Sequence, residues 1–200
     1  MSRPKVPLIS RRKVIATSLV ILENEGVDAL TVRRIAQELT VNAASLYHHF
    51  SSKEEILAAT ARAALAEMYV PEFDGGDWIN WCAEIALEHR RFLMKRPYMV
   101  QLIVQRTLPR TTLPVVVIHE KELARNAVAR AEDRAYILDS VEALIIGSAL
   151  MMRNTLPRPG MSAAKVRIET EQEERVFIDM VKALLDGLLR HFAAAKRVEQ

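Results

Sequence analysis

Apolar side chains recur at every third or fourth position along most of the chain, which is the spacing of one face of an α-helix. In the first seventy residues this pattern comes in four blocks, and each block follows a residue that can cap a helix N-terminus. The blocks predict helices at residues 11–25, 32–39, 43–50 and 53–69, which begin after Ser10, Thr31, Asn42 and Ser52. The last of these starts has the S-x-x-E form of a capping box, completed by Glu55.

The remainder of the chain keeps the helical period and shows no convincing series of strands. A strand competes only at residues 114–118, "PVVVI", where the alanines and charged residues that follow favour a helix. Proline and glycine mark breaks near residues 71–76, 97, 107–114 and 156–160. The pattern predicts further helices at residues 78–95, 98–106, 113–131, 133–154 and 169–195, and therefore an all-α chain.

The third predicted helix, "AASLYHHF", carries small residues at its start and rings at its end. At about 100° per residue, Leu46 and Phe50 share the face that turns to the core. The outward side and its flank carry Ala44, Ser45, Tyr47 and His48. A short helix that follows a tight turn and a helix able to cross the DNA backbone describes a helix-turn-helix, whose second helix enters the major groove.

We therefore expect DNA contacts from this helix and its neighbours. Ala44 and Ser45 permit close approach to bases, and Tyr47, Lys53 and Arg33 suit phosphates. The full predicted set is Arg33, Asn42, Ala43, Ala44, Ser45, Tyr47, His48 and Lys53. Adjacent histidines could also be metal ligands, but neighbouring positions point about 100° apart on a helix and no third ligand is near, so we predict no metal.

Composition narrows the class of protein. The net charge is only +3, but the first thirteen residues hold five basic side chains and no acid, which suits a phosphate backbone as well as a solvated tail. Cys82 is the only cysteine, so we expect a reducing compartment. The N-terminus has no apolar targeting segment, and the longest uncharged run, residues 143–152, is short of the roughly 18 residues of a membrane span. These features predict a cytoplasmic protein without a membrane partner.

The segment "LTVRRIAQELTVNAASLYHHFSSKEEIL" resembles the DNA-binding domain of the TetR family of transcriptional regulators. The similarity covers about residues 11–57 and is carried by the motif Leu46-Tyr47-x-His49-Phe50 and by Lys53. One departure is Thr40, where many members have glycine. The resemblance implies a homodimer in which residues 1–52 form the helix-turn-helix domain. Residues 53–200 would form a helical ligand-binding and dimerisation domain, with helix 53–69 as connector.

The predicted domain of residues 53–200 offers candidates for a small-molecule site, because such pockets are mostly apolar with a few polar groups. The candidates are Cys82, His89, Met99, Gln105, His119 and Tyr136, each of which could equally be an ordinary core or surface residue. No phosphate loop, H-E-x-x-H or G-x-S-x-G motif is present, so we predict neither an enzyme nor a cofactor. Dimerisation is expected through "ALIIGSALMM" and "FIDMVKALLDGLLRHF", which are more apolar than an outer helix requires; burial within one subunit is the alternative.

Together these features predict a ligand-responsive transcriptional regulator, most simply a repressor that binds a palindromic operator as a homodimer and is released by a small molecule. Release would follow from a differential affinity of typically about 1 to 3 kcal/mol. An alternative is a helical DNA-binding protein without an effector, whose body would have no internal cavity. A helical enzyme or lipid carrier is a further alternative, and it would show no salt-dependent DNA affinity.

Overall fold

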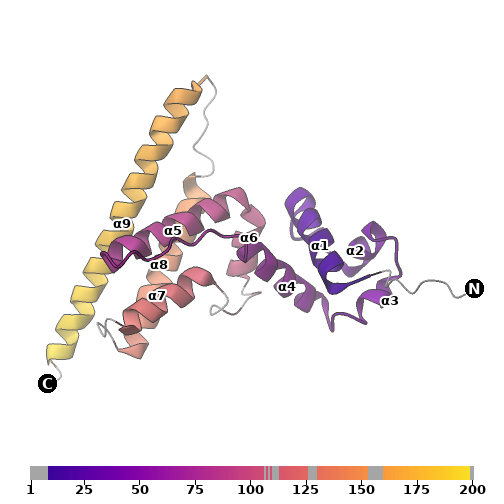
Figure 1. Cartoon of the computed structure of the whole chain (residues 1–200), viewed down its shortest axis with the longest axis horizontal. Coiled ribbons are helices and arrows are strands. Elements are labelled where there is room, and N and C mark those ends of the chain that lie inside the picture. Colours follow the sequence, from indigo (N-terminus) through magenta and orange to yellow (C-terminus); the bar gives the residue numbers. More distant parts are fainter. Residues whose placement is uncertain are drawn as a thin grey trace, which may run out of the picture. The chain divides into compact units, whose positions relative to one another are not determined.

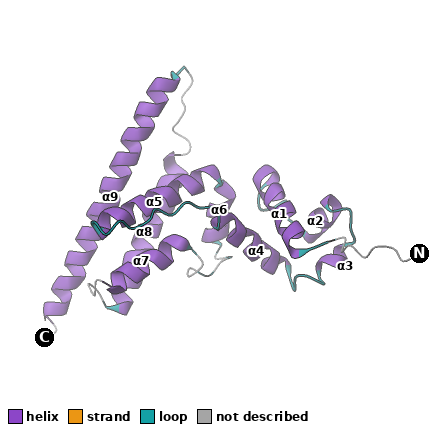
Figure 2. Cartoon of the chain, in the orientation of Figure 1, coloured by secondary structure: helices purple, strands orange, loops and turns teal. Residues whose placement is uncertain are grey.

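A computed structural model describes residues 9–105, 107, 109, 113–125, 130–152 and 160–198. Within these ranges all regular secondary structure is helical, which confirms the all-α prediction (Figures 1 and 2). The helices are α1 (Arg11–Glu25), α2 (Val32–Glu38), α3 (Ala43–Leu46), α4 (Lys53–Leu65), α5 (Trp78–Lys95), α6 (Pro97–Val104), α7 (Pro114–Arg125), α8 (Ala131–Met152) and α9 (Ala163–Val198). None of the helices described is long and apolar enough to cross a membrane.

The chain divides into two compact units. The N-terminal unit comprises Met1–Glu67 and Arg96–Pro109, and the C-terminal unit comprises Met68–Lys95 and Arg110–Gln200. Helix α4 packs on α1 and so belongs to the N-terminal unit, although the sequence places it at the start of the C-terminal domain as a connector. The functional division into residues 1–52 and 53–200 stays a prediction.

The four predicted helix starts in the N-terminal unit are confirmed, because all four capping side chains accept a backbone N–H. Ser10 Oγ accepts from Lys13, Thr31 Oγ1 from Arg34, Asn42 Oδ1 from Ala44 and Ser52 Oγ from Glu55. Helix α1 packs against α4 and α2, and α2 packs against α3. The core of the unit includes Val14, Ile21, Leu22, Leu30, Ile35, Leu46, Phe50 and Ile56.

Several helix ends differ from the prediction. Helix α3 ends at Leu46 and not near residue 50, because the chain must open into the extended Ser52 (φ −157°) that caps α4. Helix α9 begins six residues earlier than predicted, where Ser162 Oγ accepts the N–H of Lys165. The predicted stretch 126–129 and the predicted ends at residues 106 and 154 lie outside the described residues.

Helix α5 is the centre of the C-terminal unit and packs against α7, α8 and α9. Arg91 of α5 binds Glu174 of α9, with 2.7 Å between its Nε and the carboxylate. The segment before α5 is held by Trp81, whose indole N–H donates to the carbonyl of Pro71 at 2.8 Å and whose ring lies 4.9 Å from that of Phe73. With 36 residues, α9 is about 54 Å long at 1.5 Å per residue.

Candidate functional site

The turn between α2 and α3 sets the direction of α3. The N–H of Val41 bonds to the carbonyl of Ala36 and that of Thr40 to the carbonyl of Gln37, which is the hydrogen-bond pattern of a Schellman motif. Thr40 occupies the left-handed position of this motif, with φ of +55°. A threonine here therefore adopts the backbone conformation that glycine takes more easily, and the tight turn expected of a helix-turn-helix is kept.

Helix α3 and the turn after it present their polar and small residues outward. Leu46 and Phe50 are buried, as predicted for the core face. Tyr47 is 56% exposed, and Ala44 and His48 are also exposed, while Ala43, Ser45 and His49 are half-buried. Three of the predicted DNA contacts are thus accessible: Ala44 near the start of α3, and Tyr47 and His48 directly after its last residue.

Three other predicted DNA contacts differ in their surroundings. The side-chain oxygen of Asn42 caps α3, so its amide NH2 is the group that would reach DNA. Arg33 is exposed and makes no ion pair among the described residues. Lys53, the first residue of α4, is half-buried.

Arg34, next to Arg33, is held in ion pairs within the N-terminal unit. Its guanidinium binds Glu25 and Glu38, with 2.7 Å to each carboxylate. The hydrogen bonds that its guanidinium donates to these two carboxylates raise the pKa of Arg34. The two neighbouring arginines of α2 therefore have different tasks, and Arg33 is the one available for a phosphate.

Arg11 fixes the end of the ring-rich segment. Its Nη1 donates to the carbonyl of His49, its Nη2 lies 2.9 Å from Glu55, and its guanidinium carbon lies 4.1 Å from the centre of the Phe50 ring. Glu55 also accepts from the N–H of Ser51 at 2.6 Å and from its hydroxyl at 2.8 Å. These Ser51 hydrogen bonds and, after them, the bond from Arg11 hold the pKa of Glu55 down to about 2.

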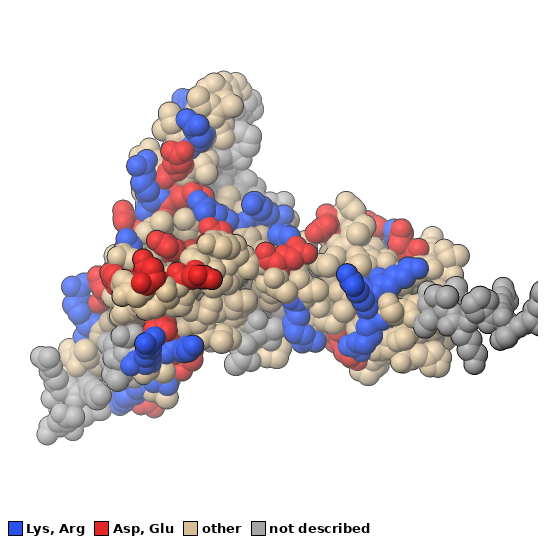
Figure 3. All heavy atoms as spheres, in the orientation of Figure 1, with Lys and Arg blue, Asp and Glu red and all other residues tan. Residues whose placement is uncertain are grey.

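The contacts of Arg11 with His49, Phe50 and Glu55 were not predicted from the sequence, in which Arg11 is only one of five basic residues near the N-terminus. The single signal was the capping box, which points to Glu55 but not to its partner about forty residues earlier. Arg12 and Lys13, beside Arg11 in the first turn of α1, are exposed. Figure 3 shows Lys and Arg side chains mixed with Asp and Glu over the face in view.

The six predicted effector contacts are divided between the two units. Met99 is buried and Gln105 is exposed, both in the N-terminal unit, and Tyr136 on α8 is 66% exposed. Cys82, His89 and His119 are buried in the C-terminal unit, where His119 Nε2 lies 3.0 Å from the carbonyl oxygen of Cys82.

The buried histidines are held neutral. Burial lowers the pKa of both His89 and His119 to about 4, and it raises the pKa of the Cys82 thiol to about 12. Within the described residues, neither ring nitrogen of His89 has a hydrogen-bond partner. Over the described ranges, no three His, Cys, Asp or Glu side chains are grouped so that they could hold a metal ion.

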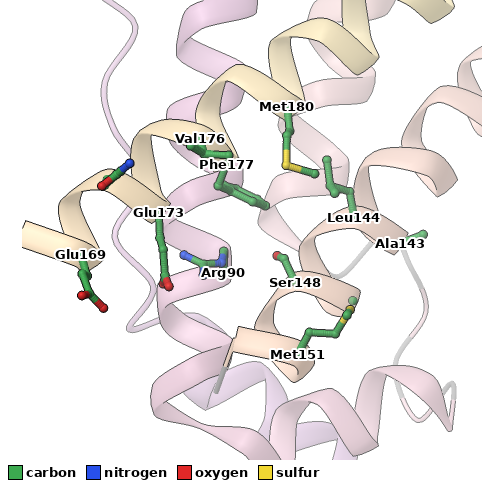
Figure 4. A pocket seen from close by; sticks show the side chains of 12 residues that line it. Arg90, Ala143, Leu144, Ser148, Met151, Glu169, Glu173, Val176, Phe177 and Met180 are labelled. Atoms are coloured by element: carbon green, nitrogen blue, oxygen red, sulfur yellow. The ribbon is translucent and has the colours of Figure 1, made fainter. Parts of the chain in front are cut away.

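A cavity of about 570 Å³ lies between α8 and α9, with Arg90 of α5 facing it (Figure 4). Its walls are formed by Ala143, Leu144, Gly147, Ser148, Met151, Glu169, Gln172, Glu173, Val176, Phe177 and Met180. None of the six effector contacts predicted from sequence lines it. The residues that line the cavity come from segments far apart in the chain, so helical periodicity alone could not predict that they lie together.

Two capped helices joined by a tight turn, with a short and accessible second helix, define a helix-turn-helix DNA-binding protein. The family described as bacterial regulatory proteins, tetR family, matches residues 14–60. Residues 14–60 are therefore similar to the DNA-binding domain of this family of bacterial regulatory proteins.

Individual relatives agree with this assignment. An HTH-type transcriptional regulator of Saccharopolyspora erythraea is 32% identical over 107 residues, which are 54% of this chain and 45% of the relative. The class G tetracycline repressor protein of Vibrio anguillarum is 36% identical over 89 residues, 43% of this chain and 42% of that protein. The matched segments thus span less than half the length of these two relatives.

A similar solved structure extends over almost the whole chain. It is the structure of a TetR variant from Acinetobacter baumannii AYE in complex with minocycline. The sequence of that variant is 25% identical to this chain. The similarity covers 91% of this chain and 97% of that one, with a TM-score of 0.67. The helical layout of both units is therefore that of a known TetR-type structure.

Proposed function

We propose that the protein is a ligand-responsive repressor that binds a palindromic operator as a homodimer and is released by a small molecule. The observation that carries the proposal is the accessible surface formed by Ala44, Tyr47 and His48 on and directly after the short, capped α3. Small side chains there allow close approach to base edges, while Tyr47 and Arg33 suit phosphates. On this proposal the protein acts in the cytoplasm and has no catalytic role.

Exposed apolar side chains on α8 and α9 support the dimer. Large apolar residues that are about half exposed or more are Tyr136, Leu150, Met151, Ile168, Val176 and Met180. Small residues lie on the same two helices, among them Ala143, Gly147, Ala183 and Gly187. Two such helices from each subunit would bury these side chains in a four-helix interface and let the backbones approach closely.

Two observations support a small-molecule effector. The similar Acinetobacter structure holds minocycline, and the C-terminal unit has a cavity between α8 and α9 whose volume lies within the range typical of ligand sites, about 300 to 1,000 Å³, and part of whose wall is the face proposed above for dimerisation. A DNA-binding protein without an effector would instead be expected to have a filled body. Ligand binding would lower operator affinity by favouring an arrangement of the two DNA-binding domains that no longer fits the half-sites.

The test is selection of bound sequences from a random duplex library by the purified protein, followed by affinity measurements on the selected site. We expect a palindrome, bound more weakly as salt increases. Tyr47→Phe should lower the affinity about fivefold, because it removes one hydrogen bond worth about 1 kcal/mol. Tyr69→Phe, at an exposed tyrosine after α4, is the matched control and should bind as the parent protein does.

A folded, dimeric protein that enriches no sequence would contradict the proposal. So would a selected site to which Tyr47→Phe and Tyr69→Phe bind equally well, because the surface after α3 would then not contact DNA.

A further inference from the structure

Tyr47 and His48 are presented to solvent by a short stretch of chain that is a turn and no longer a regular helix. Helix α3 ends at Leu46, and the N–H of His49 bonds back to the carbonyl of Leu46 at 2.9 Å. On the other side of the peptide unit, the carbonyl of His49 accepts from Arg11. His49 is therefore held at both its N–H and its carbonyl, and this fixes the path of the chain through Tyr47 and His48.

Glu55 supports the same stretch from the first turn of α4. Its carboxylate accepts from the N–H of Ser51 at 2.6 Å and from the Ser51 hydroxyl at 2.8 Å. It also accepts from Nη2 of Arg11 at 2.9 Å. Phe50 is buried, and its ring lies under the guanidinium of Arg11. A planar guanidinium can donate hydrogen bonds from its edge while its face covers a ring, and the ammonium group of a lysine cannot do both.

The three basic residues at the start of α1 therefore use their charge differently. Arg12 and Lys13 are exposed, whereas the charge of Arg11 is compensated by Glu55 and its edge is bound. The side chains of Arg11 and Glu55 are 49% and 32% exposed. Ion pairs as exposed as this contribute little to the stability of a whole domain. The main effect of Arg11 is therefore on the stretch of chain that it holds.

We propose that Arg11 is a positioning residue of the DNA-binding surface, which holds the His49 carbonyl and Glu55 so that Tyr47 and His48 meet DNA in one orientation. This role rests on the proposed binding of an operator. Arg11 itself contacts no phosphate. A site loses affinity when the side chains that support its contacts are removed, even though every contacting side chain is still present. A basic residue that binds phosphate differs, because its loss also lowers the salt dependence of binding.

The test begins with the affinity of full-length variants for the selected operator as a function of salt. Arg11→Met should weaken binding about fivefold, because the hydrogen bond of Tyr47 is no longer aligned with its phosphate. It should not lower the slope of log affinity against log salt by the value of about 1 that a lost phosphate contact gives. Arg11→Lys should weaken binding nearly as much, since lysine keeps the charge and loses the paired donors.

Glu55→Gln should give opposite results for positioning and for simple electrostatics. Electrostatics alone predicts tighter binding, because a negative charge near the phosphates is removed. Positioning predicts weaker binding, because Arg11 and Ser51 lose their charged acceptor. The matched control is Glu54→Gln, at the exposed glutamate one position earlier, which should bind at least as tightly as the parent protein. This comparison also decides the matter if Arg11→Met does not fold.

A double-mutant cycle with Tyr47→Phe separates positioning from a general loss of stability. In the Arg11→Met protein, Tyr47→Phe should lower affinity less than about twofold, against about fivefold in the parent protein, because the phenol is already displaced. The same cycle with Arg12→Met is the matched control and should be additive, since Arg12 does not hold this stretch. Urea denaturation checks that every variant is folded at the temperature of the assay.

Parent-like affinity of Arg11→Lys, together with a lower salt slope for Arg11→Met, would overturn the proposal, because Arg11 would then bind phosphate. Tighter binding by Glu55→Gln would overturn it too, as would additive effects of Arg11→Met and Tyr47→Phe. A parent protein that binds no operator would overturn the proposed function and this role of Arg11 with it. Unchanged affinity of Arg11→Met for an operator that the parent protein binds would overturn the role of Arg11 alone.

Discussion

Thr40 is a β-branched residue in a backbone conformation that usually belongs to glycine, with φ of +55° between α2 and α3. The left-handed conformation costs an ordinary residue about 1 to 2 kcal/mol. Glycine avoids this cost but loses more chain entropy on folding, which offsets part of its advantage. The sequence alone marks the position as unusual but not its geometry. The Schellman hydrogen bonds of Val41 and Thr40 show why the turn is nevertheless kept.

Thr40→Gly should raise the free energy of unfolding by about 0.5 to 1 kcal/mol, measured by urea denaturation. Gly26→Ala is the matched control in the opposite direction. Gly26 also has positive φ, +84°, and a Cβ there would meet no atom within 4 Å, so its destabilisation isolates the backbone effect. A Thr40→Gly protein less stable than the parent would show that the threonine side chain contributes more than its backbone costs.

The two neighbouring arginines of α2 allow a second comparison. Arg33→Ala should weaken operator binding and reduce the slope of log affinity against log salt by about 1, because one phosphate contact is lost. Arg34→Ala should instead lower the thermal midpoint, because Glu25 and Glu38 lose their shared partner. Equal effects of both variants on the salt slope would contradict the distinction.

At the scale of elements, capping side chains determined how well the fold could be predicted. Ser10, Thr31, Asn42 and Ser52 each mark a helix start correctly, because an N-cap is a local interaction between a side chain and a backbone three or fewer residues away. Helix ends were less predictable, since no comparable side chain marks where α3 stops. The contacts of Arg11 with Glu55 and the cavity beside Arg90 join distant segments and leave no periodic signal.

Asn42 combines a cap with a predicted DNA contact, and two substitutions separate them. Asn42→Asp keeps the cap of α3, so stability should be unchanged, while operator affinity falls because a carboxylate replaces the amide near phosphates. Asn42→Ala should lower the free energy of unfolding by about 1 kcal/mol through loss of the cap. Denaturation and operator titration of both proteins give the comparison. If Asn42→Asp binds DNA as tightly as the parent, Asn42 lies away from the phosphates.

For the whole molecule, the buried histidines predict how stability depends on pH. His89 and His119 have a pKa of about 4 in the folded protein, against about 6.5 in the unfolded chain. Unfolding therefore takes up protons below pH 6.5, so the stability that is present above this pH is lost as pH falls towards 4. The difference between the two pKa values corresponds to a loss of about 3 kcal/mol of unfolding free energy for each histidine once the pH is below 4.

The measurement is urea denaturation between pH 7.5 and 4.5. Among the titratable groups, His119 acts on His89 through its charge, and Glu122 and Asp77 act on Cys82. His89→Leu should flatten the pH dependence. The carboxyl of Glu55 titrates in a separate window, from about 4.5 down to about 2, and its contribution is lost only there. A His89→Leu protein with the parent's pH dependence would contradict the assignment.

Dimerisation is the other property of the whole molecule. Ala183→Arg places a long charged side chain on the exposed, small-residue face of α9 and should give a monomer by sedimentation, with weaker operator binding at the same protein concentration. Ala124→Arg, at an exposed alanine of α7, is the matched control and should stay dimeric. A dimeric Ala183→Arg protein would place the interface elsewhere.

The hydrogen bond from the Trp81 indole to the carbonyl of Pro71 has a spectroscopic consequence. The chain contains two tryptophans, Trp78 and Trp81, and both lie in the C-terminal unit. Tryptophan fluorescence therefore follows the unfolding of that unit alone, while circular dichroism at the amide band follows the helices of both. Overlay of the two curves on one sample would tell whether the DNA-binding helices melt together with the body, without any label attached to the protein.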